Sequence, residues 1–181
     1  MNCIGMEEIL QGAKIIACLS TAFGVIMGIV QWRKSVLIKR AELIDEILEK
    51  FRTDANIRKA VYQFDYDQFW YNEKFHDTST RENYVDIGLE YFSYVCYLRK
   101  IGILGRKDFE LFRYIIYRAL SNLGVQDYFY NLYHFSRAQH TDFPFPALLW
   151  FAKKEKILYD GFYSSDTYMK TNTIFHRYLN F

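Results

Sequence analysis

Residues Ile15–Trp32 read IIACLSTAFGVIMGIVQW, a run of eighteen residues without a charged side chain. A helix of that length is about 27 Å long, close to the roughly 30 Å hydrocarbon core of a bilayer. Lys14 precedes the run, and Trp32, Arg33 and Lys34 end it, as residues at a membrane interface commonly do. The stretch therefore predicts one transmembrane helix over residues 15–32.

Two other interpretations of this run are disfavoured by its flanks and composition. A cleaved signal peptide needs basic residues before the apolar run, but residues 1–12 contain Glu7 and Glu8 and neither Lys nor Arg. The run is also not followed by a convincing small-x-small cleavage site. A buried core helix rarely lacks charges on every face over such a length. A membrane span is the interpretation that agrees with all of these observations.

The basic residues around the span predict its orientation. Lys14 is the only one before it, whereas Arg33, Lys34, Lys39 and Arg40 follow closely. Because cytoplasmic flanks are enriched in Lys and Arg, residues 1–14 are predicted to form a short extracytoplasmic N-terminus. Residues 33–181 are then predicted to form a cytosolic domain.

Within the span, Ser20, Gly24 and Gly28 recur at intervals of four residues and share a helix face. Small residues allow two membrane helices to approach closely, although glycine is also simply frequent in such helices. One span cannot enclose a channel, so a transport function would require several copies of the chain. In such an assembly the polar residues near the lumen or its mouths would be Lys14, Thr21, Gln31 and Arg33.

The remainder of the chain has the periodicity of helices. No proline interrupts it before Pro144, and no alternating strand pattern or internal repeat occurs. The apolar spacing and the end signals predict helices over Ser35–Phe51, continuous with the span, then Asp54–Asp65, Asn83–Ile101, Asp108–Leu123, Val125–Gln139 and Pro146–Ile157. Gly102 and Gly124 are predicted helix stops, and the residues from Tyr159 onward show no period. The predicted fold is all-α, with one anchor and one helical domain.

Composition excludes several classes of function. The net charge is only +2, so direct RNA binding stays open but is not favoured, despite 35 aromatic residues. The three cysteines, Cys3, Cys18 and Cys96, are too far apart for a disulfide framework or a zinc site. No phosphate-binding glycine loop, nucleophile elbow or paired histidine motif occurs. We therefore expect no cofactor and no metal.

The stretch HFSRAQH, residues 134–140, is the one candidate for catalysis. His134, Arg137 and His140 follow one another at intervals of three, so they can share a helix edge. An arginine beside a histidine can stabilise a phosphate and transfer its proton, as in metal-independent ribonucleases. A polar helix end that meets the C-terminal dipole explains the same residues without any activity, and we prefer that explanation.

The layout of the chain resembles a known family, the small membrane accessory proteins of type VI-B CRISPR–Cas systems. The resemblance is carried by the span Ile15–Trp32, the basic collar Arg33–Arg40 and the helical body up to Ile157, within a chain of 181 residues. It implies a divergent HEPN-like domain in the bacterial inner membrane that assembles as a ring. It also implies a pore that depolarises infected cells, and a functional link to an RNA-guided RNA-targeting effector.

Three hypotheses follow, and the first is preferred. It is a non-enzymatic, homo-oligomeric membrane pore that acts in antiphage defence. The second is a membrane-tethered degenerate HEPN-type ribonuclease that uses Arg137 with His134 or His140. The R-x(4–6)-H motif discussed for the family is not present in this sequence; the nearest approach is Arg137 and His140, which are separated by only two residues. The third is a tethered interaction domain without pore or catalysis.

Overall fold

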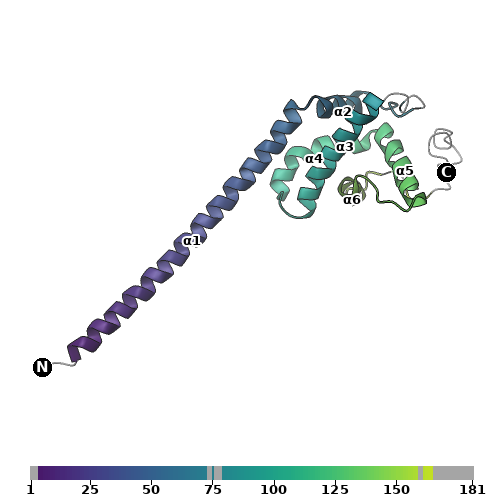
Figure 1. Ribbon diagram of the computed structural model, residues 1–181. Coiled ribbons are helices and arrows are strands. Elements are labelled where there is room, and N and C mark those ends of the chain that lie inside the picture. Colours follow the sequence, from purple (N-terminus) through teal and green to yellow (C-terminus); the bar gives the residue numbers. More distant parts are fainter. Residues whose placement is uncertain (1–3, 73–74, 76–78, 159–160, 165–181) are drawn as a thin grey trace. The chain divides into compact units, whose positions relative to one another are not determined.

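The computed structural model describes residues 4–72, 75, 79–158 and 161–164. These residues form six helices and no strand, so the prediction of an all-α fold is confirmed. In chain order the helices are α1 (Ile4–Thr53), α2 (Ala55–Tyr66), α3 (Ser79–Lys100), α4 (Arg106–Ser121), α5 (Leu123–Ala138) and α6 (Pro146–Lys154) (Figure 1).

Helix α1 is continuous over 50 residues, as the uninterrupted pattern from the span to Phe51 predicts. It starts eleven residues before the predicted span, at Ile4 rather than Ile15. The chain divides into two units, residues 1–46 and the part that begins at Ile47. The compact unit begins at Ile47, whose side chain is buried, and the predicted domain start at residue 33 stays a prediction.

The last turns of α1 belong to the compact unit, where α3 holds them. The hydroxyl of Tyr91 donates a hydrogen bond of 2.8 Å to the carbonyl of Ile47. The ring of Phe51 stacks on that of Tyr91 with 6.0 Å between centroids. A buried carbonyl of α1 thus has a side-chain partner, and an aromatic contact reinforces it.

The break between α1 and α2 lies where the sequence predicts it. Asp54 is the N-cap of α2, and its Oδ1 accepts hydrogen bonds from the backbone N–H groups of Asn56 (2.8 Å) and Ile57 (3.2 Å). This carboxylate satisfies two of the donors that a helix start leaves unpaired. The chain can therefore turn at this point without burying an unpaired donor.

Helix α3 is central to the compact unit and packs against α2, α4 and α6. Gly88 brings α3 close to α2, because a Cβ atom at this position would lie only 2.4 Å from the Cβ of Ala60. At its end, Gly102 takes a φ of 82°, the left-handed conformation that glycine adopts without strain. The predicted stop of this helix at Gly102 is confirmed.

The connection from α2 to α3, predicted as a loop, supplies core side chains. Trp70 and Phe75 are fully buried, and Tyr71 is nearly so. The indole Nε1 of Trp70 donates a hydrogen bond of 2.9 Å to the side-chain oxygen of Asn122, between α4 and α5. A polar loop in the sequence is therefore one of the main packing elements of the fold.

Asn122 also explains why Gly124 is not a helix stop. Asn122 ends α4 and is the N-cap of α5, and its side chain accepts a bond of 3.1 Å from the N–H of Val125. Gly124 lies inside α5, where a Cβ atom would be 2.5 Å from Nε1 of Trp70. The predicted stop at Gly124 is wrong, because this glycine provides room for a side chain rather than a turn.

The C-terminal part differs from prediction in one helix end. Helix α6 ends at Lys154, not Ile157, and Lys156 then takes a positive φ of 55°. Of the aperiodic segment that begins at Tyr159, residues 161–164 are described, and the side chain of Phe162 is buried. The predictions for the remaining positions of this segment lie outside the described residues.

Candidate functional site

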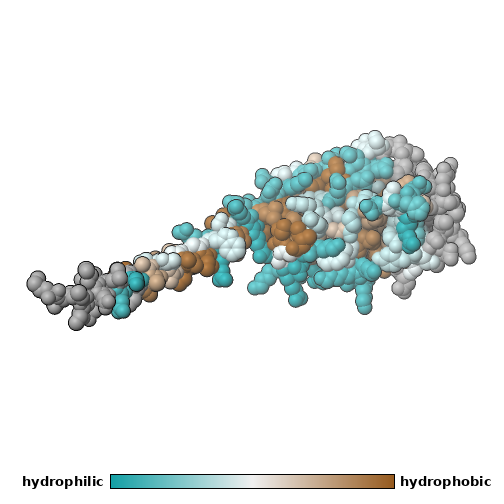
Figure 2. Space-filling model, turned by 60° about the horizontal axis from the view of Figure 1, so that its bottom comes forward, coloured by the Kyte–Doolittle hydropathy of each residue, from teal (hydrophilic) through white to brown (hydrophobic). Residues whose placement is uncertain are grey.

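The apolar segment of α1 has side chains that nothing in its own unit covers. Phe23 is 65% exposed and Ile26 is 59% exposed, and the apolar window of this helix has none of its residues buried. Figure 2 shows apolar side chains on the surface of this segment. Among the residues that the structure describes, one helix is long and apolar enough to cross a membrane, judged by length and composition. The run is not a core helix of this chain.

The small and polar residues of this segment lie along one side of the helix. Each residue of an α-helix advances by about 100° around the axis, so positions can be compared directly. Between Ala17 and Ser35, one sector of about 100° around the helix axis holds only residues with small or polar side chains. We call these residues the small-polar stripe: Ala17, Ser20, Thr21, Gly24, Gly28, Gln31 and Ser35. The other side carries the larger apolar residues, among them Leu19, Phe23, Ile26 and Val30.

The two sets of residues predicted from the sequence overlap on this stripe. Thr21 and Gln31, predicted to lie near a lumen, share the helix face of Gly24 and Gly28, which were predicted to contact other helices. Lys14 lies at the edge of the stripe. Arg33 lies on the opposite side of the helix, so it does not extend the stripe.

The centre of the stripe has one hydroxyl that is bonded within the helix and two glycines with open space beside them. The hydroxyl of Thr21 donates a hydrogen bond of 2.9 Å to the carbonyl of Ala17, one turn earlier. This bond removes the need for an outside partner, as is common for Thr in membrane helices. A Cβ atom added at Gly24 or Gly28 would meet nothing within 4 Å. The stripe is therefore open to a neighbouring helix at its centre.

The three catalytic candidates do not form one site. His134 is buried, and its Nε2 lies 3.0 Å from the carbonyl oxygen of Phe162, to which it donates a hydrogen bond. Arg137 lies over the ring of Tyr133, with 5.9 Å from its guanidinium carbon to the ring centroid. His140 is exposed beyond the end of α5 and has a positive φ of 53°. The prediction that all three share a helix edge is wrong, because α5 ends at Ala138.

The electrostatics of His134 agree with a packing role. Burial lowers the pKa of its imidazole, the bond to the carbonyl of Phe162 opposes that shift, and the charge of Arg137 adds to it. The ring of Tyr130 covers it at 4.2 Å between centroids. His134 therefore packs inside the core, where it donates to the carbonyl of Phe162.

Other chemistry finds no support among the described residues. No group of three or more His, Cys, Asp or Glu side chains there has the arrangement of a metal site. Cys96 is buried, and this burial raises the pKa of its thiol far above the usual range. A thiol that stays protonated is neither a nucleophile nor a metal ligand.

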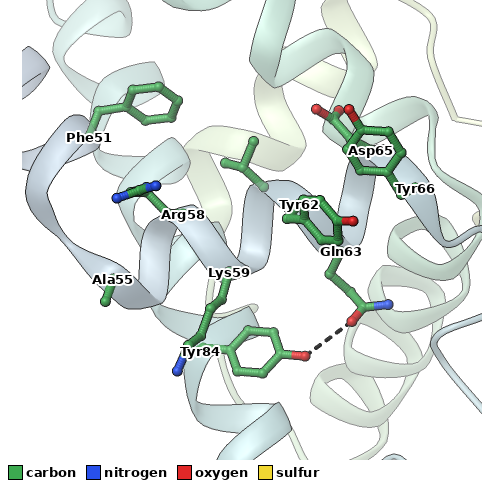
Figure 3. Close-up of a pocket in the computed structure, with 10 residues that line it drawn as sticks. Phe51, Ala55, Arg58, Lys59, Tyr62, Gln63, Asp65, Tyr66 and Tyr84 are labelled. Carbon is green, nitrogen blue, oxygen red and sulfur yellow. Dashed lines mark hydrogen bonds between the residues drawn. The ribbon is translucent and has the colours of Figure 1, made fainter.

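The compact unit has an open groove along α2 that the sequence analysis missed (Figure 3). Its volume is about 670 Å³, and it is bordered by Phe51 at the end of α1 and by Tyr84 of α3. Tyr62 and Tyr66, one turn apart and more than two-thirds exposed, place their rings 4.6 Å from each other. The hydroxyl of Tyr84 donates a bond of 3.1 Å to Oε1 of Gln63. In the sequence, the feature that could have indicated this groove is the pair of tyrosines four residues apart on one helix.

Comparisons with protein-family models, with curated proteins and with solved structures give no match for this chain. The described residues define the class of the protein: it is a helical protein with a helix long and apolar enough to span a membrane.

Proposed function

We propose that this protein is a homo-oligomeric membrane pore, in which the α1 helices of several copies surround a conduit. The compact unit would lie on the cytoplasmic side of a bacterial inner membrane. The observation that carries the proposal is the small-polar stripe on an otherwise apolar helix without covering partners. A pore-lining helix needs such a division, with one side for lipid and the other for its neighbours and the lumen.

The stripe combines small residues at its centre with a polar side chain near its end. Gln31 lies beside Trp32 at the predicted membrane interface, so its side-chain amide would meet water at the mouth of a conduit. The small residues leave room for a neighbouring helix. Gly28 and Gly24 lie about one and two turns from Gln31 along the same face, and their missing side chains allow that neighbour to approach.

The continuity of α1 links the apolar segment to the compact unit along the chain. The helix has no break between the apolar segment and Thr53, so no separate linker lies between them. The role in antiphage defence, and the link to an RNA-guided RNA-targeting effector, rest on the resemblance in layout stated above.

The proposal is tested by the mass of the full-length protein in detergent, measured by native mass spectrometry. We expect one closed assembly of several copies, and we expect Gly24→Leu with Gly28→Leu to dissociate it. Ala22→Leu is the control, because it places a leucine on the opposite side of the helix. Planar-bilayer recordings of the wild-type assembly should then give discrete conductance steps.

Two results would overturn the proposal. A monomer in detergent would remove the pore, since one helix cannot enclose a conduit, and would leave a tethered interaction domain. An assembly that tolerates both leucines but not Ala22→Leu would place the contact on the wrong face. The ribonuclease hypothesis has no specific observation in its favour, because His134 is buried and His140 lies apart from it.

A further inference from the structure

A second concave site lies in the compact unit, where the ends of three helices meet. It has a volume of about 310 Å³, at the lower end of the range for small-molecule sites. Its lining comes from the end of α3 (Arg99), from one face of α4, and from the last turns of α6. Four residues of α4 share one face, because they lie three, four and seven positions after the first of them: Arg106, Phe109, Glu110 and Arg113. We call this site the basic pocket.

The charges of the basic pocket are unequal. Four cations line it, Arg99, Arg106, Arg113 and Lys154, against two carboxylates, Glu110 and Glu155. Both carboxylates face the same cation: Arg113 lies 2.7 Å from Glu155 and 3.6 Å from Glu110. The bond with Glu155 raises the pKa of Arg113. The other three cations therefore have no carboxylate partner within the part of the chain that the structure describes.

The pocket is built on rigid supports. Phe109 and Phe151 are buried beneath it, with their rings edge to face at 5.4 Å between centroids. Nη1 of Arg99 donates a bond of 3.3 Å to the carbonyl of Leu104, which orients the guanidinium. The ammonium of Lys154 lies 5.2 Å from the centre of the Trp150 ring, a cation–π contact. Ordering of these side chains before binding lowers its entropic cost.

We propose that the basic pocket binds a small ligand through a phosphate group that carries two or more negative charges. The four cations and two carboxylates of the lining give it a net charge of +2, which favours a phosphate group with two or more negative charges. Arginine also donates paired N–H bonds that fit phosphate oxygens. The proposal does not depend on the pore, because every residue of the pocket belongs to the compact unit.

The test uses the full-length protein in neutral detergent, with pyrophosphate and ATP as probes, at about 0.15 M salt so that unspecific attraction is screened. Isothermal titration gives the affinity. We expect Arg106→Gln and Lys154→Gln each to weaken binding of pyrophosphate about tenfold or more, the loss typical of a charge-assisted hydrogen bond. Lys107→Gln and Lys153→Gln are the matched controls, because each removes a neighbouring exposed cation that does not line the pocket. These controls should change affinity less than twofold.

The source of the phosphate is distinguished by a third probe, detergent micelles that contain phosphatidylglycerol or, for comparison, phosphatidylcholine. Binding of pyrophosphate and ATP in solution assigns a soluble phosphate ligand. Saturable binding of phosphatidylglycerol alone, lost in Arg106→Gln and kept in Lys107→Gln, assigns a lipid headgroup. No saturable binding of any probe, or equal losses in the Arg106 and Lys107 variants, overturns the proposal. The oligomer mass of Arg106→Gln is expected to equal that of the wild type, which separates this test from that of the pore.

Discussion

Substitution of Asn122 by alanine is expected to destabilise the compact unit strongly. This buried amide makes four hydrogen bonds. Its oxygen accepts from Nε1 of Trp70 (2.9 Å) and from the N–H of Val125 (3.1 Å), and its nitrogen donates to the carbonyls of Phe64 (2.9 Å) and Asp67 (2.8 Å). One side chain thus joins α2, the following loop, α4 and α5.

The expected magnitude follows from these four partners. Loss of the cap of α5 costs about 1 kcal/mol. The buried indole N–H of Trp70 loses its acceptor, at about 1–3 kcal/mol, and each of the two carbonyls loses a bond with a net value of about 0.5–1.5 kcal/mol. The total of about 3–7 kcal/mol is a large part of the stability of an ordinary domain. It corresponds to a decrease in Tm of about 10 °C or more.

The assay is thermal unfolding of the full-length protein in detergent, followed by near-ultraviolet circular dichroism, which reports the packing of buried rings such as Trp70. Asn122→Asp is a second variant that keeps both accepted bonds but places carboxylate oxygens against two carbonyls; we expect it to be at least as destabilising. The matched control is Asn83→Ala at an exposed position of α3, expected to change stability by less than about 0.5 kcal/mol. A decrease in Tm for Asn122→Ala no larger than that of the control would refute the argument.

Two further predictions concern the packing of α2 on α3 and one buried histidine. Gly88→Ala places its Cβ 2.4 Å from that of Ala60, so thermal unfolding should show a decrease in stability of about 1–3 kcal/mol. Adding Ala60→Gly to this variant should restore much of the stability. A double variant no more stable than Gly88→Ala alone would contradict the predicted clash. Because burial lowers the pKa of His134, the unfolded state binds more protons, and the stability is expected to fall as the pH decreases through about 6.5. His134→Gln can keep the hydrogen bond to Phe162 but cannot titrate, so its Tm should change less with pH over this range than that of the wild type. An unchanged dependence of Tm on pH would contradict the assignment of this effect to His134.

Much of the fold follows from local signals along the chain. The run Ile15–Trp32 predicts a long apolar helix because every residue in it is uncharged, and no tertiary contact is needed to see that. Asp54 predicts a helix start because its carboxylate can reach the backbone N–H groups two and three residues later. Gly102 predicts a stop through its own backbone freedom.

The errors arose where a residue's role depends on distant partners. Gly124 has the signature of a helix stop, but its function is to leave room for Trp70, which lies 54 positions earlier in the chain. His134 and His140 have the spacing of a shared helix edge, but one points into the core and the other follows the end of α5. Spacing along a helix gives no information about which side the rest of the chain covers.

Local patterns along the chain suffice to predict the all-α class, an apolar helix long enough for a membrane, and most helix starts, because periodicity and capping act within one or two turns. The packing of the compact unit was needed to find that a loop supplies Trp70 to the core and that Asn122 joins four segments. It alone brought Arg99, Arg106 and Lys154 from three helices to one pocket. Such groupings depend on how helices pack in three dimensions, and packing brings together residues that no spacing along the chain connects.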